Sequence, residues 1–180
     1  MTPATPPQGT KVDALAFRQF MSHWASGVSV VTTRSSGINY GLTVNAFLSI
    51  SLDPPQVLIS LGYDADTTPV IQESGRFAIN VLAVDQREVS EQFARPIPSP
   101  AKFEAIGFRL SDSGLPLVSG TLGSLECQVT EQFRVSDHFL VVGKVLTVTR
   151  GRTALPLIFY RSRYGEADGP DRVRLATAID

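Results

Sequence analysis

Apolar residues at helical spacing mark the first regular element of the chain. Four of them occupy positions i, i+3, i+4 and i+7, namely Phe17, Phe20, Met21 and Trp24. This spacing places them on one face of a helix, with Asp13 before it as a candidate N-cap and Gly27 after it as a stop signal. We expect Trp24 to belong to the core.

After Gly27 the helical repeat gives way to short β-branched or alternating runs, which are typical of strands. Ser36 and Gly37 predict a turn between the first two strands. Cys127 and its apolar neighbours alternate with polar residues, and Gly143 interrupts a long apolar run as a glycine at a β-bulge does. The predicted strands are 28–33, 38–42, 47–51, 56–61, 77–82, 125–130, 139–148 and 157–160.

Two short helices are predicted between these strands, at 67–74 with Pro69 in the first turn and at 85–93. Prolines at positions 96, 98 and 100 then predict an extended loop. Regular alternation of strands and helices is missing, which argues against a doubly wound parallel sheet. The pattern favours a mainly β protein, an antiparallel barrel that is closed or nearly closed, with a few peripheral helices.

The 180 residues suit a single domain, which we place at residues 13–165. Residues 1–12 are rich in Pro and Thr and lack the apolar stretch of a signal peptide, so we expect a disordered lead-in. Residues 166–180 are polar, and we expect a loose C-terminal tail.

Composition narrows the classes of function. The formal net charge of −1 creates no field that would attract nucleic acid or an acidic membrane. No apolar run reaches the roughly 18 residues of a membrane span. Cys127 is the only cysteine, so no internal disulfide can form; we expect a buried thiol and a cytoplasmic location.

The common catalytic motifs are absent. The chain has neither the glycine-rich dinucleotide fingerprint nor the Walker A pattern, and Gly120 and Gly123 lack the required context of a strand, loop and helix. There are no paired cysteines, and His23 and His138 are far apart, so no metal site is expected. No spacing supports a serine triad built on Ser22 and His138. This absence fits an enzyme whose cofactor supplies the chemistry.

Six segments, in the same order along the chain, resemble the short-chain flavin reductase family, which supplies reduced flavin to two-component monooxygenases. The segments are FMSHWASGVSVVTT at 20–33, GLTVNAFLSISLDPP at 41–55, GRFAINVL at 75–82, Phe93 with Lys102 and Phe103, SDHFLVVGKV at 136–145 and PLIFYRSRY at 156–164. The resemblance implies a split β-barrel that forms homodimers, with FMN or FAD as cofactor and NADH or NADPH as reductant. It also implies a separate flavin-dependent monooxygenase as partner.

The resemblance also implies roles for individual residues. Thr43, Val44, Asn45 and Ala46 would lie along the flavin ring, although the same residues could form an ordinary polar turn. Ser60, Leu61, Thr67 and Thr68 would reach the flavin and its phosphate, although Asp66 or Thr67 could simply cap a helix.

Six further residues, in three segments of the chain, carry implied roles. Lys102 would contact phosphate with Phe103 packed beside it, unless it is an ordinary surface lysine. His138 would lie near the nicotinamide, unless it is structural; the family has glycine where this chain has Ser136, which affects the preceding turn. Tyr160, Arg161 and Tyr164 would flank the coenzyme or close the dimer interface.

These observations favour an NAD(P)H:flavin oxidoreductase that releases reduced flavin. A flavin-binding protein without turnover is an alternative of a different class. A reductase of another acceptor, such as a cobalt corrin or ferric iron, is a further alternative on the same barrel. An oxidase of pyridoxine-phosphate type is a weaker one.

Overall fold

The computed structural model describes residues 12–167 and 173–175, so residues 1–11 of the lead-in expected at 1–12 lie outside the described range. The helical elements are α1 (Ala14–Met21), α2 (Thr67–Ser74), the 3-10 helix η1 (Val84–Gln86), α3 (Arg87–Ala94) and α4 (Ser99–Lys102). The strands are β1 (Ser26–Gly27), β2 (Ser29–Ser35), β3 (Ile38–Val44), β4 (Phe47–Leu52), β5 (Pro55–Gly62), β6 (Arg76–Val81), β7 (Phe108–Leu110), β8 (Pro116–Val118), β9 (Gly123–Val135), β10 (His138–Arg150), β11 (Leu157–Tyr160), β12 (Arg163–Ala167) and β13 (Val173–Leu175).

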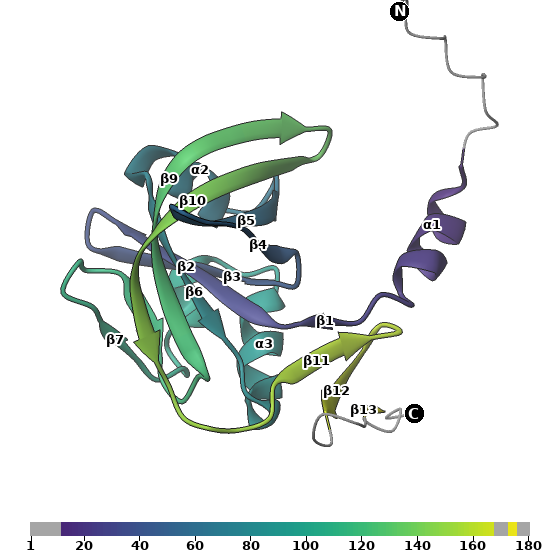
Figure 1. Ribbon diagram of the computed structural model, residues 1–180. Helices are drawn as coiled ribbons and strands as arrows, with labels where there is room; N and C mark the ends of the chain where they lie inside the picture. The colour runs from purple at the N-terminus through teal and green to yellow at the C-terminus, as the bar shows by residue number, and fades with distance from the viewer. Residues whose placement is uncertain (1–11, 168–172, 176–180) are drawn as a thin grey trace, which may run out of the picture.

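A seven-stranded antiparallel sheet in the order β3-β2-β6-β9-β10-β5-β4 forms the body (Figure 1). Its two edge strands, β3 and β4, follow one another in the sequence and are joined only by Asn45 and Ala46. Because so short a connection cannot span an open sheet, the sheet must curl until its edges meet. The edges are not paired with each other, so the barrel is split at this connection. The expected mainly β, split-barrel fold is confirmed.

Two apolar clusters hold the body together. The first fills the barrel and includes Ile59, Phe77 and Val141, all fully buried. The second lies beneath α3 and includes Phe93 and Leu157. Alternating strand residues thus fill the inside of the barrel together with Ile71 of α2, while α3 packs on the second cluster.

Glycine has a specific role at two positions. Ser36 (φ 49°) and Gly37 (φ 80°) form the tight turn that joins β2 to β3, a conformation glycine adopts without strain. At Gly143 the β9–β10 register shifts, and a Cβ atom there would lie 2.5 Å from Cζ of Phe77. The predicted bulge is confirmed, and Gly143 makes room for a phenyl ring inside the barrel.

The first helix differs from its prediction. Asp13 caps it as expected, because its Oδ2 accepts a hydrogen bond from the amide of Ala16 at 3.1 Å. The apolar face, however, is uncovered: Phe20 and Trp24 are each 75% exposed, and α1 extends away from the body (Figure 1). Trp24 is therefore not a core residue, because no other described element packs on this face.

Two loop predictions also differ from the structure. Residues 99–102 form the short helix α4 rather than an extended loop, because Pro100 occupies the first turn of that helix, where its missing N–H costs nothing. In the expected tail, β13 pairs with β12, with Gly165 opposite Leu175. Backbone pairing thus continues past residue 165, and positions 168–172 and 176–180 lie outside the described residues.

Candidate active site

A groove lies beside the split of the barrel, made of three adjoining pockets. The largest, about 720 Å³, is lined by β3, the β5–α2 connection, the end of α3 with the loop that follows it, and Lys102. A pocket of about 200 Å³ shares Thr43 and Ala94 with it. A third, of about 320 Å³, shares Val28 and Asn45 with the second. We call these three together the barrel-split groove.

The connection at the split supplies the middle of this groove. The hydroxyl of Thr43 donates to the carbonyl of Ser90 at 2.6 Å, so toward a ligand its oxygen can only accept a hydrogen bond. Val44 is 5% exposed and packs in the barrel core, which leaves only its backbone for a ligand. Asn45 is exposed and lines two of the pockets, and the carbonyl of Ala46 accepts from the amide of Ser60 at 3.0 Å.

Ser60 and Leu61 reach the groove less directly. Ser60 is tied to Ala46 by the backbone hydrogen bond just described. The Leu61 side chain is fully buried in the barrel core. Neither side chain is among the groove lining, so the structure brings these two residues near the split only through their backbone.

The threonine pair at the start of α2 is buried and hydrogen-bonded. The Thr68 hydroxyl donates to the carbonyl of Gly62 at 2.8 Å. The Thr67 hydroxyl lies 3.2 Å from Oδ1 of Asp66 and 3.3 Å from Oγ of Ser99. Asp66 in turn accepts from the amide of Ser99 at 2.8 Å. These contacts join α2 to α4, and both threonine hydroxyls already have protein partners.

Lys102 is an interior residue, only 6% exposed, and not the ordinary surface lysine weighed as its alternative. Its Nζ donates to the carbonyl of Gly41 at 3.3 Å and to that of Phe93 at 3.2 Å. Burial lowers the pKa of Lys102, and the nearby Asp66 carboxylate opposes that shift. The ammonium has three N–H groups, so two are used and one remains for a ligand in the largest pocket. Phe103 packs edge-on against Phe93, with ring centroids 4.9 Å apart.

His138 lies at the tip of the β9–β10 hairpin, opposite Gly62 on β5, and lines none of the three pockets. Its Nδ1 lies 2.9 Å from Oδ1 of Asp137, a contact that lowers the pKa of that carboxyl. Ser136 has φ 55°, the left-handed conformation that the family's glycine adopts without strain. Serine therefore keeps the turn, at some cost in backbone strain.

The C-terminal motif divides between two places. Tyr164 lines the groove, and its hydroxyl lies 2.9 Å from Oγ of Ser90. Arg161 (φ 50°) is in the β11–β12 turn, where its amide donates to the carbonyl of Ser22 at 2.8 Å. The Arg161 guanidinium lies over the ring of Tyr160, 5.4 Å from its centroid. Of the three, only Tyr164 belongs to the groove.

Sequence reasoning missed several groove residues. Ser90 is fully buried on α3 and joins Thr43 of β3 to Tyr164 of β12. Phe159 forms part of the wall beside Tyr164, with ring centroids 5.5 Å apart. Nothing at Ser90 signalled a site, because its partners on β3 and β12 are far away in sequence; Phe159 lies within the 156–164 segment of the resemblance, but no role was assigned to it.

Comparison with known proteins identifies the family. The profile described as "Flavin reductase like domain" matches residues 21–168. The chain belongs to this family.

Two relatives and two solved structures illustrate the similarity. The "NADH-dependent flavin reductase" of Rhodococcus sp is 37% identical over 159 residues, covering 86% of each chain. The "FMN reductase (NADH) SmoA" of Agrobacterium fabrum is 35% identical, covering 83% of this chain and 84% of the relative. Nitrilotriacetate monooxygenase component B of Mycobacterium thermoresistibile superposes with a TM-score of 0.83 at 33% identity, covering 92% of this chain and 93% of the other. The NADH:FAD oxidoreductase SgcE6 of Streptomyces globisporus, in complex with NAD and FAD fragments, gives 0.82 at 31% identity, covering 88% and 94%.

One relative is much longer than this flavin reductase-like chain. It is named "Probable flavin reductase", from Rhizobium meliloti, and the chain spans 42% of its length at 37% identity. In the part of the chain that the structure describes, no helix is long and apolar enough to cross a membrane. The same residues include no group of three or more His, Cys, Asp or Glu side chains placed to hold a metal ion.

Proposed function

We propose that this protein reduces FMN or FAD with NADH or NADPH and releases the reduced flavin to a separate monooxygenase. The barrel-split groove, centred on Thr43 and Asn45 in a chain of the flavin reductase family, carries this proposal. Relatives are named as reductases of this kind, including the reductase component of a nitrophenol monooxygenase. Nothing in the described residues suggests a competing acid–base or metal chemistry.

The lining of the groove suits the chemistry of a flavin. Apolar and aromatic walls suit the ring, and Thr43 offers an acceptor to a ring N–H while Asn45 offers both donors and an acceptor. When bound, the flavin accepts a hydride directly from the nicotinamide. The chain's own contribution is to hold the rings together and to keep water away, which explains why no catalytic dyad is needed.

Two charged or titratable groups complete the proposal. Lys102 would give its remaining N–H to a flavin phosphate, and its burial strengthens such a contact. His138 would lie near the nicotinamide, from the hairpin tip beside the β5–α2 connection that lines the largest pocket. Thr67 and Thr68 would then support the phosphate region through α2, since their hydroxyls are engaged with the protein.

The test is NADH or NADPH oxidation by the purified chain, measured with and without added FMN or FAD. Oxidation that requires added flavin supports the proposal. Absence of flavin-dependent turnover with either coenzyme contradicts it. Tight flavin binding without turnover would instead favour the carrier alternative, and turnover only with a cobalt corrin or ferric iron would favour another acceptor.

We further propose a homodimer formed through the outer face of the sheet. Leu58 points away from the barrel core, because Val57 and Ile59 on either side of it are buried inside. Leu48 lies directly opposite Leu58 on the same face, and it is 51% exposed. On the same face, Phe133 of β9 lies directly opposite Leu140 of β10, and Phe133 is 50% exposed. These four residues form an apolar outer-sheet patch of the kind that a subunit contact covers.

Light scattering on Leu48→Asp tests the dimer, with Ile38→Asp as control because Ile38 is 43% exposed but lies at the β2–β3 turn. We expect a dimer for the wild type and the control, and a monomer for Leu48→Asp. A monomeric wild type would contradict the proposal. The buried Cys127 thiol is compatible with the reducing cytoplasm, the compartment in which we place the protein.

Release of reduced flavin to the monooxygenase has its own test. The two proteins are placed on opposite sides of a membrane that passes flavin but not protein, under low oxygen. We expect monooxygenase activity to persist and to fall when a flavin scavenger is added. Activity only when the proteins can touch would mean direct transfer in a complex.

A further inference from the structure

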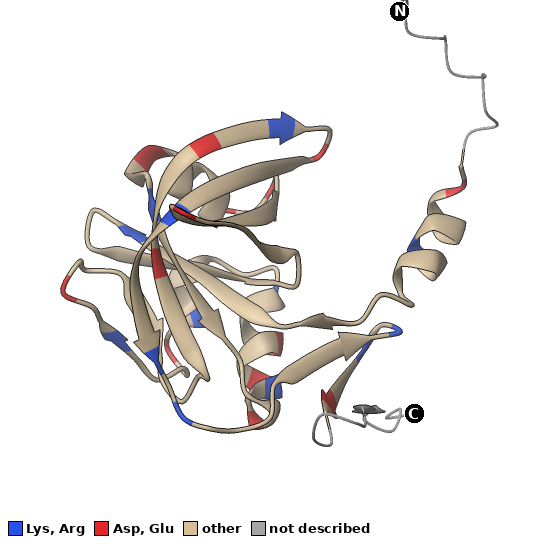
Figure 2. Ribbon diagram, viewed as in Figure 1, with Lys and Arg blue, Asp and Glu red and all other residues tan. Residues whose placement is uncertain are grey.

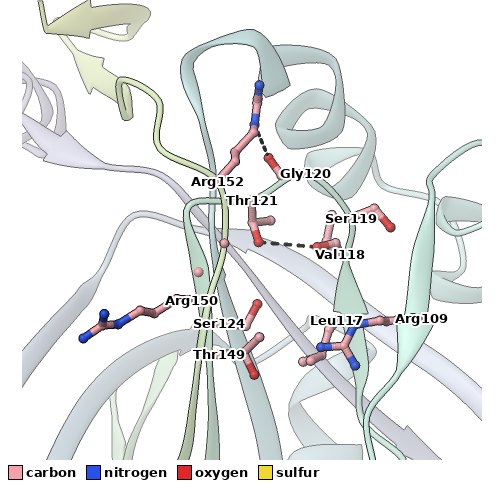
Figure 3. Close-up of a pocket in the computed structure, with 12 residues that line it drawn as sticks. Arg109, Leu117, Val118, Ser119, Gly120, Thr121, Ser124, Thr149, Arg150 and Arg152 are labelled. Atoms are coloured by element: carbon pink, nitrogen blue, oxygen red, sulfur yellow. Dashed lines mark hydrogen bonds between the residues drawn. The ribbon is translucent and has the colours of Figure 1, made fainter.

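A second pocket, of about 400 Å³, lies between the β7–β8 hairpin and the facing ends of β9 and β10 (Figure 3). It shares no lining residue with the barrel-split groove. Its lining is Arg109, Leu117, Val118, Ser119, Gly120, Thr121, Gly123, Ser124, Thr149, Arg150, Gly151 and Arg152. We call it the arginine pocket.

The lining is strongly one-sided in charge. It contains three arginines and no Asp or Glu, and Figure 2 shows their positions gathered over β7, the end of β10 and the connection that follows. Asp85 pairs with Arg152, which also donates to the carbonyl of Gly120 at 2.7 Å. Within the described part of the chain, the side chains of Arg109 and Arg150 make no hydrogen bond or ion pair. Arg150 follows Thr149 on β10 and its side chain extends away from the pocket (Figure 3), so Arg109 is the arginine that brings an unpaired guanidinium to it.

The wall of the pocket is fixed before any ligand arrives. Asn80 is fully buried, and its Oδ1 accepts from the amide of Val118 at 3.0 Å and from the hydroxyl of Ser124 at 2.9 Å. Thr121 donates to the carbonyl of Val118 at 3.4 Å. Thr149 also lines the pocket, and its hydroxyl has no hydrogen-bond partner among the described residues. A rigid wall with a free hydroxyl, facing the free guanidinium of Arg109, is preorganised for an anion.

We propose that the arginine pocket binds the phosphate group of a small phosphorylated molecule, at a site separate from the flavin groove. Arg109 would contact the phosphate, since a guanidinium presents paired N–H groups that match two phosphate oxygens. Thr149 would donate its hydroxyl from the facing strand. A volume near 400 Å³ lies at the lower end of the range for small-ligand sites, with room for a phosphate and a sugar-sized group.

Calorimetric titration tests this proposal on the full chain, with lumiflavin, which carries no phosphate, present in excess to fill the ring site of the flavin groove. The probes are inorganic phosphate, adenosine monophosphate and adenosine, which separate the phosphate from the group attached to it. The variants are Arg109→Gln and Thr149→Val, with Arg18→Gln as control because Arg18 is exposed on α1, outside the arginine pocket.

We expect phosphate and adenosine monophosphate to bind and adenosine not to bind. Arg109→Gln should weaken binding about tenfold, the lower end for a charged hydrogen bond, while Thr149→Val has a smaller effect and Arg18→Gln none. FMN binding should be the same in all variants.

No phosphate binding, equal affinity in Arg109→Gln, or equal binding of adenosine would each overturn the proposal. Loss of phosphate binding in Lys102→Met, with binding kept in Arg109→Gln, would assign the anion to the flavin groove instead. Because flavin-dependent NADH oxidation is measured separately, these outcomes leave the proposed reductase activity untouched.

Discussion

Replacing Lys102 with methionine removes a buried ammonium group while keeping a side chain of similar length. The change breaks the hydrogen bonds of Nζ to the carbonyls of Gly41 and Phe93. Hydrogen bonds from a charged donor contribute about 1.5–3 kcal/mol each, but burying the ammonium offsets much of this. The Gly41 carbonyl also keeps the hydroxyl of Ser99, at 3.2 Å. We therefore expect a net loss of about 1–3 kcal/mol in the free energy of unfolding.

The same substitution should act on flavin. Loss of one charge-assisted contact to phosphate corresponds to about a tenfold to hundredfold weaker affinity. The phosphate is remote from the reacting ring, so kcat at saturating flavin should change much less than the dissociation constant. Flavin fluorescence titration and steady-state kinetics measure the two quantities. Lumiflavin, which lacks the phosphate, is the matched ligand and should bind both proteins equally.

The lowered pKa of Lys102 predicts how flavin affinity and stability depend on pH. The folded protein releases this proton at a lower pH than the unfolded chain, so the affinity for the flavin phosphate should fall on alkalinisation, before an ordinary lysine would titrate. Between the two pKa values of Lys102, the unfolded chain still holds this proton and the folded protein has released it. The free energy of unfolding therefore rises with pH in that range. Both effects should be absent in Lys102→Met. An unchanged flavin titration in this variant would show that Lys102 has only a structural role.

Three further changes probe the barrel, the groove and the thiol. Gly143→Ala should cost about 1–3 kcal/mol in urea unfolding, because its methyl group would overlap the ring of Phe77; a neutral effect would mean that the ring can move aside. Ser90→Ala should raise the KM for flavin several-fold, at a cost of about 1 kcal/mol for the lost hydrogen bond, and Tyr164→Phe should reproduce this if that bond is the cause. Cys127, whose pKa is raised to about 12 by burial, should stay unreactive toward a thiol reagent at neutral pH until the protein is denatured; rapid labelling of the native protein would contradict its buried position.

The strands and turns could be predicted because their signals are local. The strand at 125–130 and the turn at Ser36 and Gly37 each depend on neighbouring residues, and the structure confirms both. The alternation of a buried and a solvent-exposed face within that strand is wrong at Glu126, which is 7% exposed because the hydroxyls of Ser111 and Ser113 cover and bind its carboxylate. The bulge at Gly143 was predictable for the same reason. The family resemblance also pointed to Thr43 and Asn45, which lie in the middle of the groove.

The remaining features depend on contacts between distant residues. Periodicity identified α1 but could not show that nothing in the described chain covers Phe20 and Trp24. The burial of Lys102 depends on Gly41, which is 61 positions away in the sequence. The contact between Ser90 and Tyr164 spans 74 positions. No local pattern encodes such pairs, because either residue alone is an ordinary helix or strand residue.

The position of the groove at the meeting edges of the sheet links ligand binding to the last stage of folding. Its lining joins Thr43 on β3, Ala94 on α3 and Tyr164 on β12, which come together only when these elements have docked around the closed sheet. A partly folded chain in which β3 and β4 have not yet joined the sheet lacks the groove. Flavin bound there therefore stabilises only the fully folded form, and by mass action this stabilisation grows with the flavin concentration. In a cell, the supply of flavin would then help to set how much of this protein is folded, as well as how fast it works.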